Sequence, residues 1–289
     1  MDIRAILVGL AFALMWSSAF TSARIIVVDA SPLLALSARY LISGILGVCI
    51  ARALGQSWRL TPAQWRATII FGVLQNAVYL GLNFIAMQTI EASLAAIIAS
   101  TMPLLVGLAS WLVLGERLRP LGIAGLVAGV AGVALIMGGR MDGGVDLYGL
   151  ALCGIGVVAL TVATLMVRGA TSGGNFLMIV GLQMLVACVA LGLATLAFET
   201  PRFNPSWPLL IAFAYTCLVP GLAATLVWFW LVNRLGATRA ATFHFLNPFF
   251  GVTIAALLLG EELGPRDILG VTVIAAGILA VQIARQKRS

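Results

Sequence analysis

One pattern of proline, glycine and glutamate occurs twice in this chain at a constant spacing. Pro103 and Pro248 each lie in an apolar stretch, and a Gly-Glu pair follows 12 residues later in both cases. The prolines are 145 residues apart, and the same register relates further residues: Gly115-Glu116 and Gly260-Glu261, Ala95 and Ala240, Pro120 and Pro265, Gly125 and Gly270, Gly132 and Gly277. The chain is therefore predicted to contain one module in two copies, residues 1–140 and 141–289.

Each copy contains five apolar runs that are long enough to cross a bilayer. A helix rises 1.5 Å per residue, so about 20 apolar residues span the ~30 Å hydrocarbon layer. We place the ten runs at about 5–28, 32–51, 67–90, 92–115, 121–138, 147–167, 176–198, 209–233, 240–260 and 268–284. With 62% hydrophobic and 9% charged residues and short connections, the sequence predicts an all-α integral membrane protein without a soluble domain.

The odd number of crossings in each copy determines how the copies are oriented. The second copy must enter the membrane inverted relative to the first, which is typical of transporters whose substrate site lies near the midplane, where the repeats meet. A channel or a membrane enzyme can also carry a duplication. Transport is therefore the favoured interpretation of the architecture.

The distribution of basic residues predicts the orientation of the whole chain. The net charge of +7 could suggest a nucleic-acid partner. With a cytoplasmic N-terminus, however, twelve of the seventeen Lys and Arg residues fall on the inner side, which is the positive-inside pattern. We therefore expect both termini in the cytoplasm and no nucleic-acid partner. The first apolar run is expected to be retained as a helix, because a cleavable signal peptide has a shorter run and a small-residue cleavage site.

Two side chains deep in the first two helices are candidates for binding substrate. Trp16, with Phe20 one turn further, lies about 11 residues into the first run, where a cavity would give its indole N–H a partner; a lipid-facing position is the alternative. Arg39 lies within the second run. A guanidinium binds a carboxylate through two parallel hydrogen bonds, but Arg39 could equally hold backbone carbonyls or extend to the interface.

The third helix carries a polar stripe. Gln75, Tyr79 and Asn83 follow one another at intervals of four residues, so on an α-helix they share one face. Polar groups that face lipid lack partners, and we expect at least Tyr79 to line a cavity. Such residues can also join neighbouring helices by hydrogen bonds.

Further candidates come from the later helices. They are hydroxyl, aromatic, imidazole and amide side chains at membrane depth: Ser100, Thr164, Tyr215, His244 and Asn247. Thr164 can instead satisfy its own backbone. Pro103 and Pro248 are predicted to be hinges, because proline inside a helix leaves a carbonyl without its usual donor.

The sequence contains no sign of catalysis or of a bound cofactor. No Asp or Glu lies in the interior of a predicted helix, and there is no metal-ligand cluster, nucleotide-binding loop or arrangement of nucleophile and base. The four cysteines are expected to be core residues. His244, the only histidine, could carry proton coupling; we favour a uniporter, with no cofactor and no metal.

The fifth helix has a ridge of small residues. Gly122, Gly125, Gly129 and Gly132 follow one another at intervals of three or four residues and form a ridge of the small-xxx-small kind, which lets helices approach closely. We favour packing within the bundle over a dimer seam, and so expect a monomer or a weak homodimer in the lipid bilayer.

Several of these segments resemble a known family. Trp16-Ser17-Ser18-Ala19-Phe20, Pro103 with Gly115-Glu116-Arg117-Leu118, and Asn247-Pro248 with Gly260-Glu261 are similar to the drug/metabolite transporter superfamily with duplicated EamA domains. Ser17 stands where that family commonly has Gly. The resemblance implies a ten-helix, inverted-repeat carrier of the bacterial inner membrane that exports amino acids or related metabolites. Chain length and deep aromatic residues are similar to bacterial aromatic amino-acid exporters.

The expected function is therefore export of a small-molecule substrate, an amino acid with an aromatic or apolar side chain or a related metabolite, by alternating access. A phosphate-bearing substrate would need several deep cations, and only Arg39 qualifies. The alternatives are export of drugs or other cations and, less favoured, a membrane enzyme or assembly factor.

Overall fold

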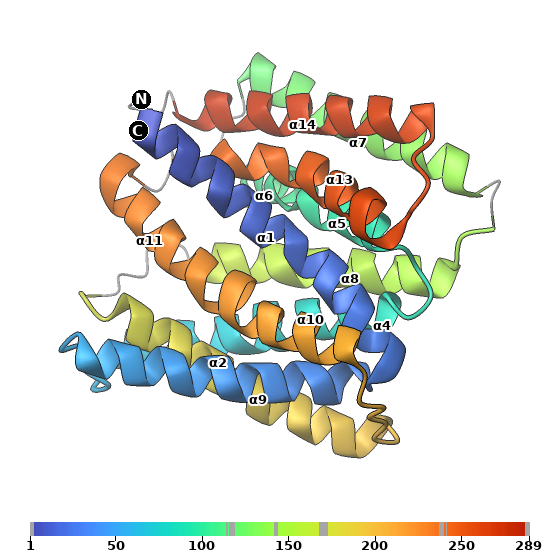
Figure 1. The fold of residues 1–289 in the computed structure, drawn as a ribbon. Coiled ribbons are helices and arrows are strands. Elements are labelled where there is room, and N and C mark those ends of the chain that lie inside the picture. Colours follow the sequence, from blue (N-terminus) through green and yellow to red (C-terminus); the bar gives the residue numbers. More distant parts are fainter. Residues whose placement is uncertain are drawn as a thin grey trace. The chain divides into compact units, whose positions relative to one another are not determined.

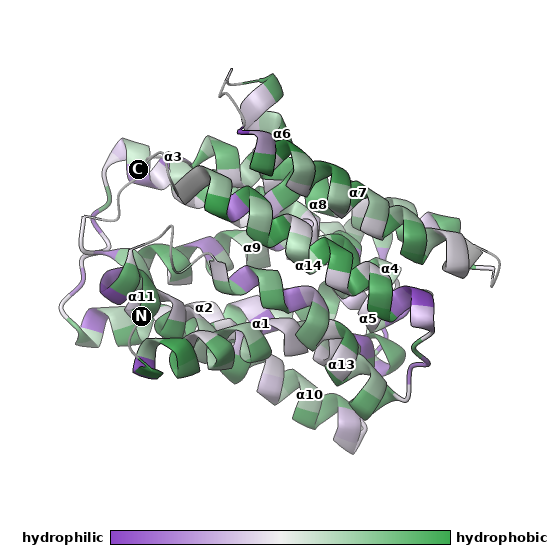
Figure 2. Ribbon diagram, turned by 90° about the horizontal axis from the view of Figure 1, so that it is seen from above, coloured by the Kyte–Doolittle hydropathy of each residue, from purple (hydrophilic) through white to green (hydrophobic). Residues whose placement is uncertain are grey.

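The computed structural model describes residues 3–113, 115, 119–141, 144–167, 173–236, 240 and 242–286. Within these residues the regular structure is helical, and one isolated bridge joins Ala30 and Phe203. Ten helical stretches are long and apolar enough to cross a membrane, and they match the ten predicted runs within a few residues. Figure 2 shows that the helices are hydrophobic over most of their length and that hydrophilic residues concentrate at their ends and connections. The predicted all-α, ten-helix class is confirmed.

Six of the ten spans are single helices, and four are composites. The single helices are α1 (Ile3–Asp29), α2 (Pro32–Ala53), α7 (Pro120–Met141), α8 (Leu147–Met166), α9 (Phe176–Phe198) and α14 (Pro265–Gln286). The third span joins α3 (Pro62–Phe71), the π-helix η1 (Gly72–Tyr79) and α4 (Leu80–Ala86); the fourth joins α5 (Ala92–Ser100) and α6 (Met102–Leu112). The eighth joins α10 (Trp207–Leu218), the π-helix η2 (Val219–Ala223) and α11 (Ala224–Leu235); the ninth joins the 3-10 helix η3 (Thr242–Leu246) and α13 (Asn247–Leu259).

The repeated prolines begin helical segments. Pro103 lies in the first turn of α6 and Pro248 in the first turn of α13, each just after an interruption of its span. The prediction that each proline lies in the interior of one helix is therefore wrong, whereas the prediction that the prolines act as hinges stays a prediction. Proline fits the first helical turn because the N–H that it lacks would have no intrahelical partner there. The fourth and ninth spans are thus each built from two segments.

The Gly-Glu pairs follow the ends of the same two spans. Gly115 and Gly260 have φ angles of 65° and 69°, a left-handed conformation that glycine adopts without a steric penalty. Beyond Gly260, the carboxylate of Glu261 accepts hydrogen bonds from the first backbone N–H groups of α5, Ala92 at 2.7 Å and Ser93 at 3.0 Å. The Glu261 carboxylate thus caps α5 from the loop that follows α13. Glu116 lies outside the described residues.

The chain forms two compact units, and each takes helices from both repeats. Unit 1 comprises Met1–Thr21, Thr89–Ala151 and Ala224–Ser289, and unit 2 comprises Ser22–Gln88 and Leu152–Ala223. Within each unit, a helix of the first repeat packs against its counterpart in the second: α7 against α14 in unit 1, and α2 against α9 in unit 2. In unit 1, α5 of the fourth span also packs against α13 of the ninth span. Figure 1 shows α14 beside α7 and α2 beside α9.

Glycines set the separation of α7 and α14 in unit 1. A Cβ added at Gly125 would lie 2.7 Å from the carbonyl oxygen of Gly277, and one at Gly132 would lie 2.8 Å from that of Gly270. Residue numbers along α7 increase from Gly125 to Gly132, whereas those of the facing residues in α14 decrease from Gly277 to Gly270. The two equivalent helices are therefore antiparallel, as inverted repeats require. The predicted glycine ridge therefore packs within the bundle.

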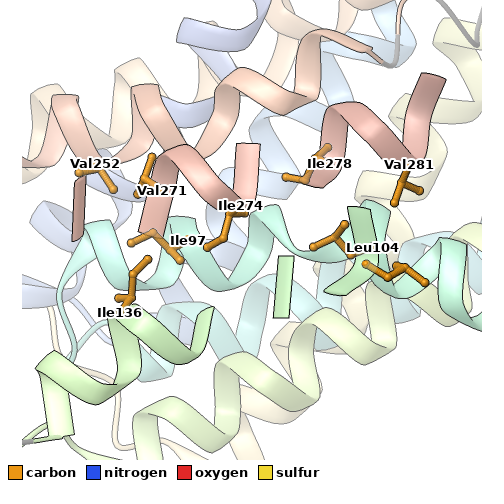
Figure 3. Packing of buried hydrophobic residues seen from close by; sticks show 9 residues of the cluster. Ile97, Leu104, Ile136, Val252, Val271, Ile274, Ile278 and Val281 are labelled. Atoms are coloured by element: carbon orange, nitrogen blue, oxygen red, sulfur yellow. The ribbon is translucent and has the colours of Figure 1, made fainter. Parts of the chain in front are cut away.

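The core of unit 1 lies between these helices and the composite spans. Figure 3 shows aliphatic side chains from α5, α6, α7, α13 and α14 that meet in one cluster: Ile97, Leu104, Leu126, Ile136, Val252, Val271, Ile274, Ile278 and Val281. In lipid, such clusters stabilise mainly through close packing, because hydrocarbon is as apolar as the side chains themselves. The first turn of α1 and the last turn of α14 lie at the same end of unit 1 (Figures 1 and 2).

Unit 2 is organised around α2 and α9, which are also antiparallel. A Cβ on Gly44 would lie 3.1 Å from the Gly181 carbonyl oxygen, and the Ser37 hydroxyl donates to the Cys188 carbonyl at 2.9 Å. A side chain that follows the C-terminus of each of these helices caps the N-terminus of the other helix. Glu199, after α9, accepts from the N–H groups of Leu33 and Leu34 in α2, while Gln56, after α2, accepts from Met178 in α9.

Candidate functional site

An aromatic cluster in unit 1 surrounds the single histidine. The ring centroid of His244 lies 5.3 Å from that of Phe12, 6.0 Å from that of Trp16 and 5.3 Å from that of Trp228. Phe12 and Trp16 are one turn apart on α1, and Phe12 also contacts Trp228 at 5.1 Å. Helix α11 supplies Trp228 and η3 supplies His244. We call these four residues the aromatic cluster.

Asn247 joins the aromatic cluster through its amide. The Asn247 Nδ2 lies 2.9 Å from the His244 Nδ1, and the Asn247 backbone carbonyl accepts from the Ser17 hydroxyl at 3.2 Å. Because an amide nitrogen only donates, Nδ1 accepts and the imidazole is neutral with its proton on Nε2. The Asn247 Oδ1 is buried and has no hydrogen-bond partner among the described residues.

The remaining candidates in unit 1 are Phe20 and Ser100. Phe20 is buried on α1. The Ser100 hydroxyl, in the last turn of α5, donates to the Ala96 carbonyl at 2.6 Å, so its proton is used by its own helix. Unit 1 thus contains five of the predicted site residues: Trp16, Phe20, Ser100, His244 and Asn247.

Arg39 is the most unusual side chain of unit 2. It is only 6% exposed, and its Nε is buried without a hydrogen-bond partner among the described residues. The guanidinium carbon lies 5.2 Å from the ring centroid of Tyr40, a cation–π distance. Helix α2 positions the guanidinium near Gly221 of η2, where an added Cβ would lie 3.8 Å from the Arg39 Nη2 and 3.2 Å from the Ser43 hydroxyl. A buried cation with unused donor capacity is suited to bind an anion.

The polar residues of the third span lie in and after a π-helix. Tyr79 and Asn83 are buried in unit 2, whereas Gln75 is half-buried and donates to Asn76 at 3.4 Å. The Asn83 amide donates to the Tyr79 carbonyl at 2.8 Å and accepts from Cys153 in α8 at 3.4 Å. Asn83 therefore links the third and sixth spans.

Two other candidates of unit 2 differ in exposure. The Thr164 hydroxyl donates to the Leu160 carbonyl at 2.8 Å, so it bonds its own helix. Tyr215 in α10 is 37% exposed. Together with Arg39, Gln75, Tyr79 and Asn83, these residues belong to unit 2.

Several residues of these sites were not predicted from the sequence. Phe12 precedes Trp16 by four residues and Ser43 follows Arg39 by four, so helical spacing could have indicated both. Trp228 lies near the end of its apolar run, a position typical of the interfacial belt, yet its ring packs on Phe12 and His244. No sequence pattern indicated Gly221, because its role depends on the Arg39 and Ser43 side chains that approach it in the folded protein.

The comparisons with known proteins identify the family. A family model described as the EamA-like transporter family matches this chain twice, over residues 3–138 and 147–282. The chain belongs to the EamA-like transporter family. It is a multi-pass membrane protein and a transporter, and the two EamA matches fit the duplication that the proline and Gly-Glu register predicts.

Relatives of this EamA-like transporter span most of its length. The uncharacterized transporter YdeK of Bacillus subtilis is 30% identical, with 87% of each chain covered. The uncharacterized transporter YvbV of the same organism is 27% identical, covering 93% of this chain and 88% of YvbV. The WAT1-related protein At3g02690, chloroplastic, of Arabidopsis thaliana is 22% identical, and the match covers 92% of this chain and 66% of that protein. A solved crystal structure matches 100% of both chains at 22% identity with a TM-score of 0.70, which shows a shared fold.

Proposed function

We propose that this protein exports amino acids with aromatic or apolar side chains, or closely related carboxylate metabolites, across the bacterial inner membrane by alternating access. The observation that carries the proposal is the buried Arg39 guanidinium, whose Nε has no partner among the described residues of unit 2. A charge at membrane depth is costly and usually marks a substrate pathway. A substrate carboxylate would supply the missing acceptors.

The aromatic cluster of unit 1 supports the choice of side chain. Rings from α1, α11 and η3 offer apolar surface together with few polar atoms, a composition that suits a small organic solute. A drug or other organic cation would suit the rings equally well, but the buried Arg39 guanidinium of unit 2 would then have no role in binding. The carboxylate-bearing solute is therefore the better match.

We also propose that both termini are cytoplasmic and that transport is not coupled to protons. The first turn of α1 and the last turn of α14 lie at one end of unit 1 (Figure 1), which supports one side of the membrane for both termini, and the distribution of basic residues favours the cytoplasmic side. No carboxylate lies in the interior of an apolar run. The neutral His244 is already an acceptor for Asn247. We favour a uniporter that runs down its substrate gradient.

Flux measurements on purified protein test the proposal. Liposomes containing the transporter are loaded with radiolabelled amino acids, with and without an imposed pH gradient, and efflux is compared with that of protein-free liposomes. We expect efflux of aromatic and large apolar amino acids that does not depend on the pH gradient, and strong losses in Trp16→Ala and Tyr79→Ala. Folded protein that carries no member of the panel, or carries organic cations instead, would refute the proposal.

A further inference from the structure

Asn247 has one polar atom for which the described residues of unit 1 supply no partner, and this atom lies beside the aromatic cluster. We propose that the Asn247 Oδ1 accepts a hydrogen bond from the ammonium group of the transported amino acid. The assignment rests on the proposed function and adds to it, because it distinguishes an amino acid from a simple carboxylate.

Two hydrogen bonds hold Asn247, and neither of them uses its side-chain oxygen, Oδ1. The Nδ2 donates to the His244 Nδ1 at 2.9 Å, and the Asn247 backbone carbonyl accepts from Ser17 at 3.2 Å. These contacts connect the first residue of α13 to η3 and to α1. The side chain is therefore positioned in advance, and the Oδ1 is buried without a donor among the described residues. A buried acceptor without a partner is unfavourable in the empty site and becomes favourable when a ligand donates to it.

The surroundings favour a cationic donor. The His244 ring, which holds the Asn247 amide, is also in contact with Trp16 and Trp228. Tryptophan faces attract ammonium groups most strongly among the aromatic side chains, and the attraction grows when water is excluded. An ammonium has three donors, so it can bond to the Oδ1 while it lies against a ring.

A zwitterion also explains why no acidic residue is needed. A simple amine that is buried without a carboxylate partner would be strongly disfavoured. An amino acid carries its own carboxylate, so it enters the protein with no net charge. Amide and ring groups are then sufficient to recognise its ammonium end.

The test compares two solutes that differ only in the ammonium group, L-phenylalanine and 3-phenylpropanoate, in liposomes containing the full-length transporter. We expect wild type to carry phenylalanine at least ~10-fold faster, the usual scale for a hydrogen bond to a charged group. In Asn247→Leu, phenylalanine flux should fall ~10-fold or more while 3-phenylpropanoate flux stays within about twofold. Asn247→Asp keeps an oxygen acceptor and should retain the preference. Thr195→Val, which removes a hydroxyl that bonds its own helix at Leu191, is the matched control and should leave the ratio unchanged.

Each outcome has a defined meaning. Equal fluxes in wild type, or equal losses of both solutes in Asn247→Leu, would overturn the ammonium assignment while the proposed export of carboxylates stands. Absence of both fluxes in folded wild type would refute the proposed function and the assignment with it. If Asn247→Leu does not yield monodisperse protein, Asn247→Ala takes its place, and the wild-type ratio alone still decides against the assignment if it equals one.

Discussion

Gly125 of α7 lies so close to Gly277 of α14 that a Cβ at Gly125 would stand 2.7 Å from the Gly277 carbonyl oxygen. Because that atom belongs to the backbone, Gly125→Ala must push the two helices apart. We expect a loss of about 1–3 kcal/mol in stability, the usual range for overpacking, seen as a lower thermal midpoint in detergent.

A glycine on the same helix provides the control for this substitution. Gly138 has nothing within 4 Å of an added Cβ. Gly138→Ala should therefore be neutral or stabilising by about 0.5–1 kcal/mol, because alanine loses less backbone entropy in a helix. Similar midpoints for the two variants would show that α7 and α14 are not in close contact.

Arg39→Met should separate activity from stability. Methionine has a similar shape and removes a buried charge, so we expect amino-acid efflux to fall tenfold or more while the thermal midpoint stays the same or rises. Arg39→Lys keeps the charge without the paired donors and should retain part of the flux. Arg24→Met is the contrast, because Arg24 donates to the Met87 carbonyl and its loss should lower stability. A large drop in the midpoint of Arg39→Met would indicate a structural role.

Glu261→Ala should destabilise the start of α5. The substitution removes both acceptors for the Ala92 and Ser93 N–H groups, a loss of about 1–2 kcal/mol by comparison with other helix caps. Glu261→Gln keeps one acceptor, so its thermal midpoint should lie between those of wild type and Glu261→Ala. Glu262→Ala, at the exposed neighbouring position, should have little effect. Equal midpoints for Glu261→Ala and Glu262→Ala would contradict the cap.

Asp146, before α8, should make stability depend on pH. The Thr89 hydroxyl, together with the Gly149 and Tyr148 N–H groups, holds the pKa of Asp146 below its usual value of 3.8. A lowered pKa in the folded state stabilises above the unfolded pKa, and this contribution is lost as the pH falls through the folded one. The difference in thermal midpoint between wild type and Asp146→Asn should therefore be full at neutral pH and shrink below about pH 4. A difference that stays constant from pH 7 to 3 would contradict this linkage.

The helices and the duplication could be predicted from sequence because both depend on local composition and spacing. The apolar runs define α1 and α14 directly, and the register identifies Gly125 and Gly270 as equivalent. Which helices become neighbours does not follow from equivalence. The packing of α7 on α14 depends on surfaces that meet only after insertion.

The π-helices are the clearest feature that the sequence did not reveal. The stripe of Gln75, Tyr79 and Asn83 assumes 3.6 residues per turn, but η1 has wider turns over Gly72–Tyr79. Asn76, instead of Gln75, is the buried amide there. The shift of 145 residues places η1 over 217–224, which includes η2, so both copies carry the same irregularity. Gly221 lies in η2 beside Arg39, and π-helical turns often occur at functional sites.

The pairing of α7 with α14 and of α2 with α9 has a consequence for how the protein can be made. A fragment that ends at residue 140 contains α7 without α14 and α2 without α9. The complementary fragment contains α14 and α9 without the helices against which they pack. Neither half encloses a finished interior, so the two would have to be synthesised together and thread into the lipid in opposite directions before either could mature. A single five-helix copy could form the equivalents of these contacts only in an antiparallel pair of identical chains.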